Sequence, residues 1–235
     1  MLASAGLDSA VLLALEARRR IVQPLYVSTG LAWEAEERRM LGRLVAALAR
    51  DGRVLPLVSL VCDMRDVYRD QHWAVRGEPP GYHTPDEDVY LDGRNIVLLA
   101  KAAVYAARAG IARIALGPLA GNPFPDARPA FFAAMRRALA LGLDASLEIA
   151  TPLARMHKAE VIALGRRLGV PLGLTLSCMS PDAGRHCGRC SKCRERLEAF
   201  REAGVADPAV YVRRNRSRAD LTSAGARSSR RRSGE

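Results

Sequence analysis

Aromatic residues are scarce in this chain of 235 residues, because Phe, Trp and Tyr together make up only 5% of it. Proteins that bind single-stranded nucleic acid stack bases on aromatic side chains, so this scarcity argues against nucleic-acid binding as the main function. The chain also lacks any run of about 18 consecutive apolar residues, and its N-terminus lacks the charged-then-apolar pattern of a secretory signal. We therefore expect a cytoplasmic protein with no membrane partner.

The net charge of +11 is concentrated at the C-terminus. Residues 213–235 hold eight arginines against Asp220 and Glu235, so this segment carries +6 and the rest of the chain +5. Because the segment is also rich in serine and glycine, we expect a basic, disordered tail that binds nucleic acid at most weakly. A zinc-containing nucleic-acid-binding module remains an alternative function, based on this tail and on the cysteines described below.

Short apolar runs alternate with longer stretches of helical periodicity. The apolar runs cover 21–27, 54–61, 114–116 and 147–149, and the helical stretches cover 9–20, 33–49, 94–109, 129–141 and 157–168. This alternation predicts an α/β fold in which helices cover both faces of a parallel sheet. Ligands bind beyond the carboxyl ends of the strands in such folds. Four loops are therefore candidate site segments, and they begin at Ser4, Ser28, Cys62 and Gly117.

A turn of small residues precedes the first predicted helix, in the order Ser4, Ala5, Gly6, Leu7, Asp8 and Ser9. Small side chains let backbone N–H groups approach a phosphate, and the N-terminus of a helix adds partial positive charge. Ser4 and Ser9 offer hydroxyl donors, and Asp8 is suited to ordering the turn or holding Mg²⁺. From these residues alone, an ordinary helix cap explains the segment equally well.

Four of the five cysteines lie close together in the sequence, at Cys178, Cys187, Cys190 and Cys193. Two-residue spacers let consecutive thiolates turn toward one ion, and a fourth ligand completes a tetrahedron. A structural Zn²⁺ is the favoured interpretation, with an iron–sulfur cluster as the alternative. A closed four-thiolate site leaves Zn²⁺ no open position for a substrate, so the metal would serve folding rather than catalysis.

The Ser4–Ser9 segment resembles the Ser-Gly-Gly-x-Asp-Ser loop of PP-loop ATP pyrophosphatases, which holds pyrophosphate while an acyl-adenylate forms. Within that superfamily, the chain resembles the 7-cyano-7-deazaguanine synthase (QueC or ExsB-like) family over about residues 1–208. The segments that carry this likeness are the cysteine spacing, the Gly-Arg-Asn turn at 93–95, Pro-Asp-Ala-Arg at 125–128, Thr-Pro-Leu at 151–153 and Lys-Ala-Glu at 158–160.

The resemblance implies a five-stranded parallel sheet with helices on both faces and a homodimer. It implies a PP-loop ATP-binding domain over 1–172 and a C-terminal four-cysteine zinc element over 173–208. The implied activity is that of a ligase that uses ATP and Mg²⁺ to convert 7-carboxy-7-deazaguanine and ammonia to the nitrile, through an adenylate and an amide. The residues carried over are Ser4, Asp8 and Lys158 for catalysis, Ser4–Ser9 with Arg94 and Asn95 for ATP, and Asp126 and Arg128 for the deazapurine.

The chain departs from the family pattern at several places. Ala5 stands where the family has glycine, which would cost on the order of 1 kcal/mol if the position requires a positive φ. Only residues 1–3 precede the loop, so we expect a stub of a strand that apolar residues upstream would stabilise. The loops at 28–34 and 118–124 also differ. They leave open an alternative, a PP-loop paralogue that adenylates another carboxylate or joins a deazapurine to a macromolecule.

Overall fold

The computed structural model describes residues 1–212, so the basic tail predicted for 213–235 lies outside the described residues. The strands are β1 (Leu25–Ser28), β2 (Val58–Val61), β3 (Arg113–Ala115) and β4 (Glu148–Ala150). The helices are α1 (Leu7–Ala17), α2 (Glu34–Leu48), α3 (Arg65–Tyr68), α4 (Trp73–Arg76), α5 (Arg94–Arg108), α6 (Pro129–Leu143), α7 (Lys158–Arg167) and α8 (Ser191–Glu202). None of these helices is long and apolar enough to cross a membrane. The α/β class predicted from the sequence is confirmed.

The strands pair in parallel as two separate two-stranded sheets, β1 with β2 and β3 with β4. Residues 1–3 run between them, since Leu2 N donates to Ala115 O at 2.9 Å and Ala3 N donates to Leu25 O at 2.8 Å. The prediction of one five-stranded sheet is therefore not confirmed. The physical reason is that residues 1–3 join the two sheets through backbone hydrogen bonds but are too few to form a strand of their own.

The first two strands are also shorter than predicted. Pro24 and Pro56 lie inside the apolar runs 21–27 and 54–61, and proline has no N–H group to donate to a neighbouring strand. Regular pairing therefore begins only after each proline, at Leu25 and Val58. The residues before the prolines keep a single isolated bridge.

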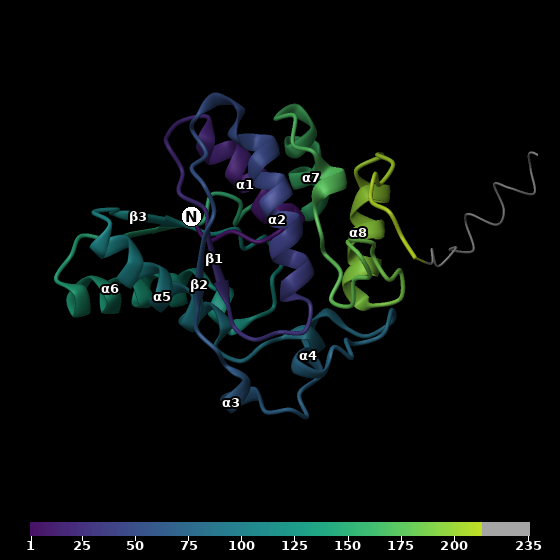
Figure 1. The fold of residues 1–235 in the computed structure, drawn as a ribbon, viewed down its shortest axis with the longest axis horizontal. Coiled ribbons are helices and arrows are strands. Elements are labelled where there is room, and N and C mark those ends of the chain that lie inside the picture. The colour runs from purple at the N-terminus through teal and green to yellow at the C-terminus, as the bar shows by residue number, and fades with distance from the viewer. Residues whose placement is uncertain (213–235) are drawn as a thin grey trace, which may run out of the picture.

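Helices cover both faces of the strands, as predicted (Figure 1). On one face α5 and α6 pack against β1 and β3, where Leu99 and Phe132 are buried with Leu25 and Ile114. On the other face α1, α2 and α7 form a second apolar cluster that extends to the cysteine-bearing segment, with α8 packed against α7. The two clusters place the loop before α1 between the layers.

α1 and α7 lie very close together. A Cβ atom added at Gly165 would lie only 2.7 Å from Val11 Cγ2, so the glycine allows α7 to approach α1. At the start of α7, His157 N donates to Glu160 Oε2 at 2.7 Å, which is half of a capping box and fixes where the helix begins. This packing brings Lys158, the first residue of α7, next to the loop that precedes α1.

The connection 62–92 contains α3 and α4 and packs back onto the rest of the chain. The rings of Trp33 and Trp73 stack with centroids 5.8 Å apart, which ties α4 to the start of α2. Further along, Arg194 donates to Thr84 O at 3.0 Å and to Asp86 Oδ1 at 2.9 Å. The segment therefore spans the distance from β2 to the cysteine-bearing segment.

Candidate active site and metal centre

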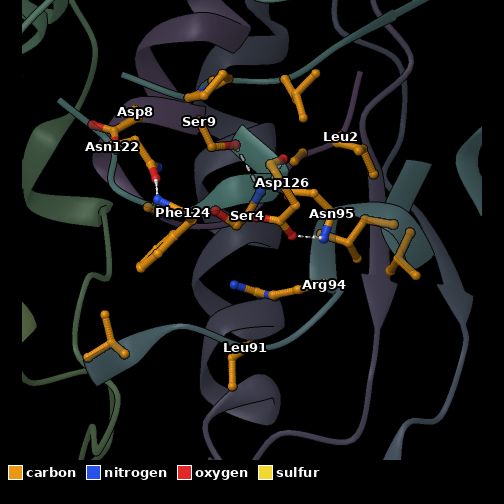
Figure 2. Close-up of a pocket in the computed structure, with 18 of the residues that line it drawn as sticks. Leu2, Ser4, Asp8, Ser9, Leu91, Arg94, Asn95, Asn122, Phe124 and Asp126 are labelled. Carbon is orange, nitrogen blue, oxygen red and sulfur yellow. Dashed lines mark hydrogen bonds between the residues drawn. The ribbon is translucent and has the colours of Figure 1, made fainter. Parts of the chain in front are cut away.

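The Ser4–Ser9 loop connects residues 1–3 to α1 and forms one wall of a cavity (Figure 2). Ser4 N donates to Ser9 Oγ at 2.8 Å, and Gly6 N donates to Ser4 Oγ at 3.1 Å. These two bonds fold the loop around its own hydroxyl groups and keep both serines beside the amides that open α1. Hydroxyl groups and helix-opening amides together suit a phosphate.

Ala5 fits this loop without backbone strain. Its φ is not positive and its side chain is fully buried, so the cost considered for a left-handed conformation does not arise. Gly6 has a φ of −61°, which any residue can adopt. A Cβ atom added at Gly6 would lie 3.2 Å from Ser4 Oγ, so the loop needs a glycine there for space rather than for conformation.

The cavity beside the loop has a volume of about 290 Å³ and lies at the carboxyl ends of β1 and β3. This is the edge of the sheets where the strand order predicts ligand binding. Its walls come from the Ser4–Ser9 loop, β1, the end of the 62–92 connection, the start of α5 and the segment that follows β3. The lining residues used below are Tyr26, Arg94, Asn95, Asn122, Phe124 and Asp126.

Arg94 and Asn95 begin α5 directly after Gly93, whose φ of +68° favours glycine. Asn95 N donates to Asp126 Oδ2 at 2.9 Å, and Asn95 Nδ2 donates to Asp126 O at 3.0 Å. Figure 2 shows Arg94 extending into the cavity, and its buried Nε has no hydrogen-bond partner among the described residues. A guanidinium with an unused buried donor is suited to a carboxylate or a phosphate.

Asp126 and Arg128, predicted together as substrate residues, lie in different surroundings. Asp126 is buried at the cavity, within the 3-10 turn Pro125–Ala127. Arg128 is exposed at the N-cap of α6 and does not line the cavity. The turn separates these two neighbours in sequence, so only Asp126 is placed to contact a ligand here.

Lys158 lies between two carboxylates. Its Nζ is 3.7 Å from Asp8 Oδ2 and contacts Glu195 Oε1, while Glu195 Oε2 accepts a hydrogen bond from Lys192 Nζ at 2.7 Å. Burial lowers the pKa of Lys158, but the neighbouring carboxylates Asp8 and Glu195 outweigh burial and raise it overall. Burial likewise raises the pKa of Glu195, but Lys158 and Lys192 more than offset this and lower it to about 2. Lys158 and Glu195 therefore both stay charged at neutral pH.

A second cleft of about 370 Å³ adjoins the cavity on the side of α8. Lys158, Lys192 and Glu195 line it. It shares four lining residues with the cavity, namely Asp8, Gly117, Asn122 and Phe124. An anion held at the Ser4–Ser9 loop would therefore face this cleft.

Two buried glutamates near the cavity were not singled out from the sequence. Glu34 accepts from Thr29 N at 2.7 Å and from Gly30 N at 3.2 Å, which fixes the divergent loop after β1. Glu37 accepts from the Tyr26 hydroxyl at 2.9 Å, and burial raises the pKa of this carboxyl although Tyr26 and the Arg94 guanidinium oppose the shift. In the sequence both resemble the acidic first turn of an ordinary helix. Their spacing of three residues, which puts them on one helix face, is the only signal of a shared role.

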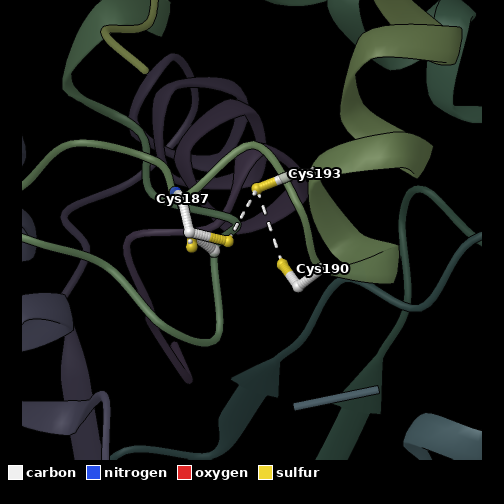
Figure 3. A group of neighbouring side chains, drawn as sticks. Cys187, Cys190 and Cys193 are labelled. Carbon is white, nitrogen blue, oxygen red and sulfur yellow. Dashed lines mark hydrogen bonds between the residues drawn. The ribbon is translucent and has the colours of Figure 1, made fainter. Parts of the chain in front are cut away.

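The four predicted cysteines come together in one buried cluster. Figure 3 shows three of them, Cys187, Cys190 and Cys193. All four Sγ atoms lie within 4.8 Å of one another, with Cys187 and Cys193 at 3.9 Å and Cys190 and Cys193 at 3.5 Å. A tetrahedron with Zn–S bonds of about 2.3 Å has sulfur–sulfur edges of about 3.8 Å. Backbone N–H groups of Cys187 and Ser180 donate to Cys178 Sγ at 3.2 and 3.3 Å, which favours the thiolate. The cluster therefore fits a Zn²⁺ ion.

A buried ion pair holds the chain beyond α8 against the cysteine-bearing segment. Arg196 donates from Nε and Nη2 to the two carboxylate oxygens of Asp207, each at 2.9 Å, and from Nη1 to Thr175 Oγ1 at 2.8 Å. The side chains of Arg196 and Asp207 are only 0% and 2% exposed. His186 is buried beside the four cysteines but is not one of the clustered ligands. Its Nε2 accepts a hydrogen bond from Ser177 N at 3.1 Å, so it supports the backbone next to Cys178.

Comparisons with known proteins agree with these features. A family model described as queuosine biosynthesis protein QueC matches residues 1–204. A 7-cyano-7-deazaguanine synthase from Anaeromyxobacter dehalogenans (strain 2CP-C) is 35% identical over 223 residues, covering 91% of this chain and 95% of that protein. Another, from Anaeromyxobacter sp. (strain Fw109-5), is 37% identical over 225 residues, covering 91% and 96%. A third, from Magnetococcus marinus (strain ATCC BAA-1437 / JCM 17883 / MC-1), is 41% identical over 130 residues, covering 52% and 57%. With its loop, cavity and cysteine cluster in place, the chain belongs to the QueC family.

Proposed function

We propose that this protein is an ATP-dependent ligase that converts 7-carboxy-7-deazaguanine and ammonia to 7-cyano-7-deazaguanine. Relatives that match nearly the whole chain carry the name of this synthase. The observation that carries the proposal is the cavity itself, where the Ser4–Ser9 loop faces the Arg94 guanidinium across one space. A phosphate site opposite a carboxylate site is what the formation of an acyl-adenylate requires.

The loop and Lys158 are assigned to ATP. The hydroxyl groups of Ser4 and Ser9 and the amides that open α1 would hold the leaving pyrophosphate, with Lys158 adding positive charge. Asp8 Oδ1 is buried and has no hydrogen-bond partner in the described part of the chain, so this oxygen fits a hard cation such as Mg²⁺. When bound, Mg²⁺ would neutralise phosphate charge.

The reaction proceeds in two activations. A carboxylate oxygen of the acid attacks the α-phosphorus of ATP, the α–β phosphoanhydride bond breaks, and pyrophosphate leaves the adenylate. Ammonia attacks the acyl carbon and AMP leaves, which gives the amide with loss of a proton. In the second round the amide oxygen attacks the α-phosphorus of another ATP. Pyrophosphate leaves, and loss of AMP together with both protons of the amide nitrogen then gives the nitrile.

The resemblance implies that Arg94 and Asn95 contact ATP; here we instead assign Arg94, together with Asp126, to the acid. The Arg94 guanidinium is placed to orient its carboxylate, and the buried Asp126 carboxylate is the acceptor that the amidine edge of a guanine-like base needs. Asn95 holds Asp126 in place through the two hydrogen bonds described above. Arg128 is left out of this assignment because it is exposed outside the cavity.

The remaining structural features that the resemblance implies are also part of the proposal. We assign one Zn²⁺ per chain to the four cysteines as a structural ion, within an element over 173–208 that follows the ATP-binding domain over 1–172. Residues 1–3 are assigned the place of the central strand in a five-stranded sheet, because their backbone already bonds to both neighbouring strands. We also propose that the protein forms a homodimer.

A second candidate function keeps the adenylation but changes the acid. The segment after β3 departs from the family pattern, and its Phe124 ring lies 5.1 Å from the ring of Tyr90 at the cavity wall. This aromatic pair shapes the space for the acid, so a paralogue that activates another carboxylate would show its difference there.

The test incubates the purified protein with ATP, Mg²⁺, ammonia and a panel of deazapurine acids, and follows nucleotides and products by mass spectrometry. The proposal predicts AMP and pyrophosphate only when 7-carboxy-7-deazaguanine is present, with the amide appearing before the nitrile. AMP formed only with another acid would support the second candidate instead. ADP as the product would refute adenylation.

Variants sharpen the same assay. Ser4→Ala should lower the rate of AMP formation by about 100-fold, with a much smaller change in ATP affinity, because the loop binds pyrophosphate best as it leaves. Arg137→Gln removes an exposed charge from α6, away from the cavity, and should leave the rate unchanged.

A further inference from the structure

Two lysines from different helices converge on one carboxylate beside the Ser4–Ser9 loop. Lys158 Nζ contacts Glu195 Oε1, and Lys192 Nζ lies 2.7 Å from Glu195 Oε2. The side chains of Lys158, Glu195 and Lys192 are 21%, 24% and 25% exposed. They therefore lie at the surface of the second cleft, where a small molecule can reach them.

This cluster lies next to the Ser4–Ser9 loop. Lys158 Nζ is also 3.7 Å from Asp8 Oδ2, and Asp8 lines both the cavity and the second cleft. Lys192 lines the second cleft together with Lys158. Both lysines lie in the first turn of a helix, α7 and α8, whose N-terminus adds partial positive charge.

We propose that Lys158 and Lys192 form a binding site for the pyrophosphate that leaves the Ser4–Ser9 loop, and that Glu195 is the internal counter-ion of this site. The inference rests on the proposed function, since adenylation is the reaction that releases pyrophosphate. Two ammonium groups that meet at one carboxylate are already arranged as an anion would arrange them. Incoming pyrophosphate displaces the carboxylate of Glu195 and takes over both lysines.

This site gives the cysteine cluster a part in handling the product. Lys192 lies between Cys190 and Cys193, so the same backbone that presents two of the sulfur ligands also presents Lys192 to the cleft. Lys192 is not part of the residues assigned to ATP above.

Glu195 sets how strongly the site holds its anion. The Glu195 carboxylate lies between the two ammonium groups and offsets part of their positive charge. A negative charge about 7 Å from an anion, at an effective dielectric constant of about 20, weakens anion binding by more than tenfold, and exposure to salt reduces this effect. Glu195 therefore keeps the affinity for pyrophosphate low enough for the product to leave.

The test measures the binding of inorganic pyrophosphate by isothermal titration calorimetry, at low salt and with and without Mg²⁺. Glu195→Gln should tighten pyrophosphate binding by about 10-fold, because it removes the competing charge and keeps the size of the side chain. Lys192→Gln should weaken binding by about 5- to 10-fold. Unchanged or weaker binding by Glu195→Gln, or wild-type affinity in Lys192→Gln, would overturn the proposal.

Glu198→Gln is the matched control. Glu198 lies on α8 and lines the same cleft, its side chain is 52% exposed, and its ion pair is with Arg194 at 3.8 Å. Its removal should change pyrophosphate affinity less than about threefold, because exposure to water screens its charge. An increase in pyrophosphate affinity as large as that of Glu195→Gln would show that any carboxylate at the cleft weakens binding, and it would also overturn the proposal.

Zinc content and thermal melts of each variant report whether the protein is folded. If Glu195→Gln loses zinc, the pair Lys192→Gln and Lys192→Arg decides, since only the arginine variant should keep wild-type binding within about threefold. Pyrophosphate binding needs no acid substrate, so it is measured independently of the activity. Binding as predicted with no AMP from any acid would refute the proposed function alone. Normal AMP formation with unchanged binding in Lys192→Gln would refute this inference alone.

Discussion

The close approach of α1 and α7 predicts that Gly165→Ala destabilises the protein. Gly165 lies in the last turn of α7, where alanine would ordinarily be preferred over glycine by at most about 1 kcal/mol. Here the new methyl group would lie 2.7 Å from Val11 Cγ2 and 3.2 Å from Leu172 Cδ2. Val11 is fully buried, so it cannot move aside into solvent.

The two opposing effects set the size of the change. Overfilling a packed interior costs about 1–3 kcal/mol, which exceeds the gain in helix propensity. We therefore expect a net loss of about 1–2 kcal/mol in the free energy of unfolding and a melting temperature lower by about 2–8 °C. Because α7 must shift away from α1, Lys158 should also shift relative to Asp8, and AMP formation should slow.

Urea and thermal denaturation measure this prediction, with Gly42→Ala as the control. Gly42 lies within α2, and a Cβ atom added there would have no neighbour within 4 Å. The control should stabilise the protein by about 0.5–1 kcal/mol, so the two glycine-to-alanine changes should have opposite signs. In the Gly165→Ala background, Val11→Ala should cost less than it does alone, because it removes the clashing methyl group. A Gly165→Ala variant as stable as the wild type would refute the packing argument.

Three further predictions concern the metal, the buried ion pair and Arg94. Elemental analysis should find about one zinc per chain, whereas stoichiometric iron with visible absorption would indicate an iron–sulfur cluster. Arg196→Met should lower the free energy of unfolding by about 3–5 kcal/mol at neutral pH, against little change for the exposed Arg201→Met, because Asp207 loses its guanidinium partner while it stays buried. Burial raises the pKa of Asp207, but Arg196 lowers it overall, so this stabilisation is fully present above the ordinary Asp pKa of about 3.9 and is lost below it. In urea melts, the difference in unfolding free energy between the wild type and Arg196→Met should therefore shrink as the pH falls. A difference that stays constant with pH would contradict this reasoning. Arg94→Lys should raise the KM for the acid by about 10-fold, since lysine keeps the charge but loses the planar fork. An unchanged KM for the acid would exclude this assignment, and a raised KM for ATP alone would place Arg94 at the nucleotide instead.

The helices were predictable because their limits depend on local residues. Pro129 begins α6 and Gly93 precedes α5, so the predicted ranges 129–141 and 94–109 lie close to the observed ones. The strands were less predictable, since an apolar run indicates burial and not pairing. Pro24 and Pro56 were the local signal for the late start of β1 and β2, because a residue without an N–H group cannot continue a ladder.

Site residues were predictable where a single segment contains the whole geometry. The cysteine cluster is an example, since three of its ligands lie within seven residues and the fourth is near in sequence. Arg128 shows the opposite case, because its neighbour Asp126 is buried while Arg128 faces solvent at the cap of α6. The contact of Lys158 with Glu195 depends on how α8 docks against α7, and no local pattern encodes that docking.

The 62–92 segment connects the cysteine cluster to the cavity, so a metal bound at the cluster would also affect the cavity. Gly81 pairs with Cys190, and Pro80 O accepts from Ser191 N at 3.1 Å, so the backbone at a sulfur ligand holds this segment directly. The same segment ends in residues 89–91, which form part of the cavity wall. An ion bound by Cys190 would therefore also hold in place the wall that faces the Ser4–Ser9 loop. A metal closed in by four thiolates would take no part in bond making. Through this segment it would still help to set the shape of the cavity in which the reaction is proposed to occur.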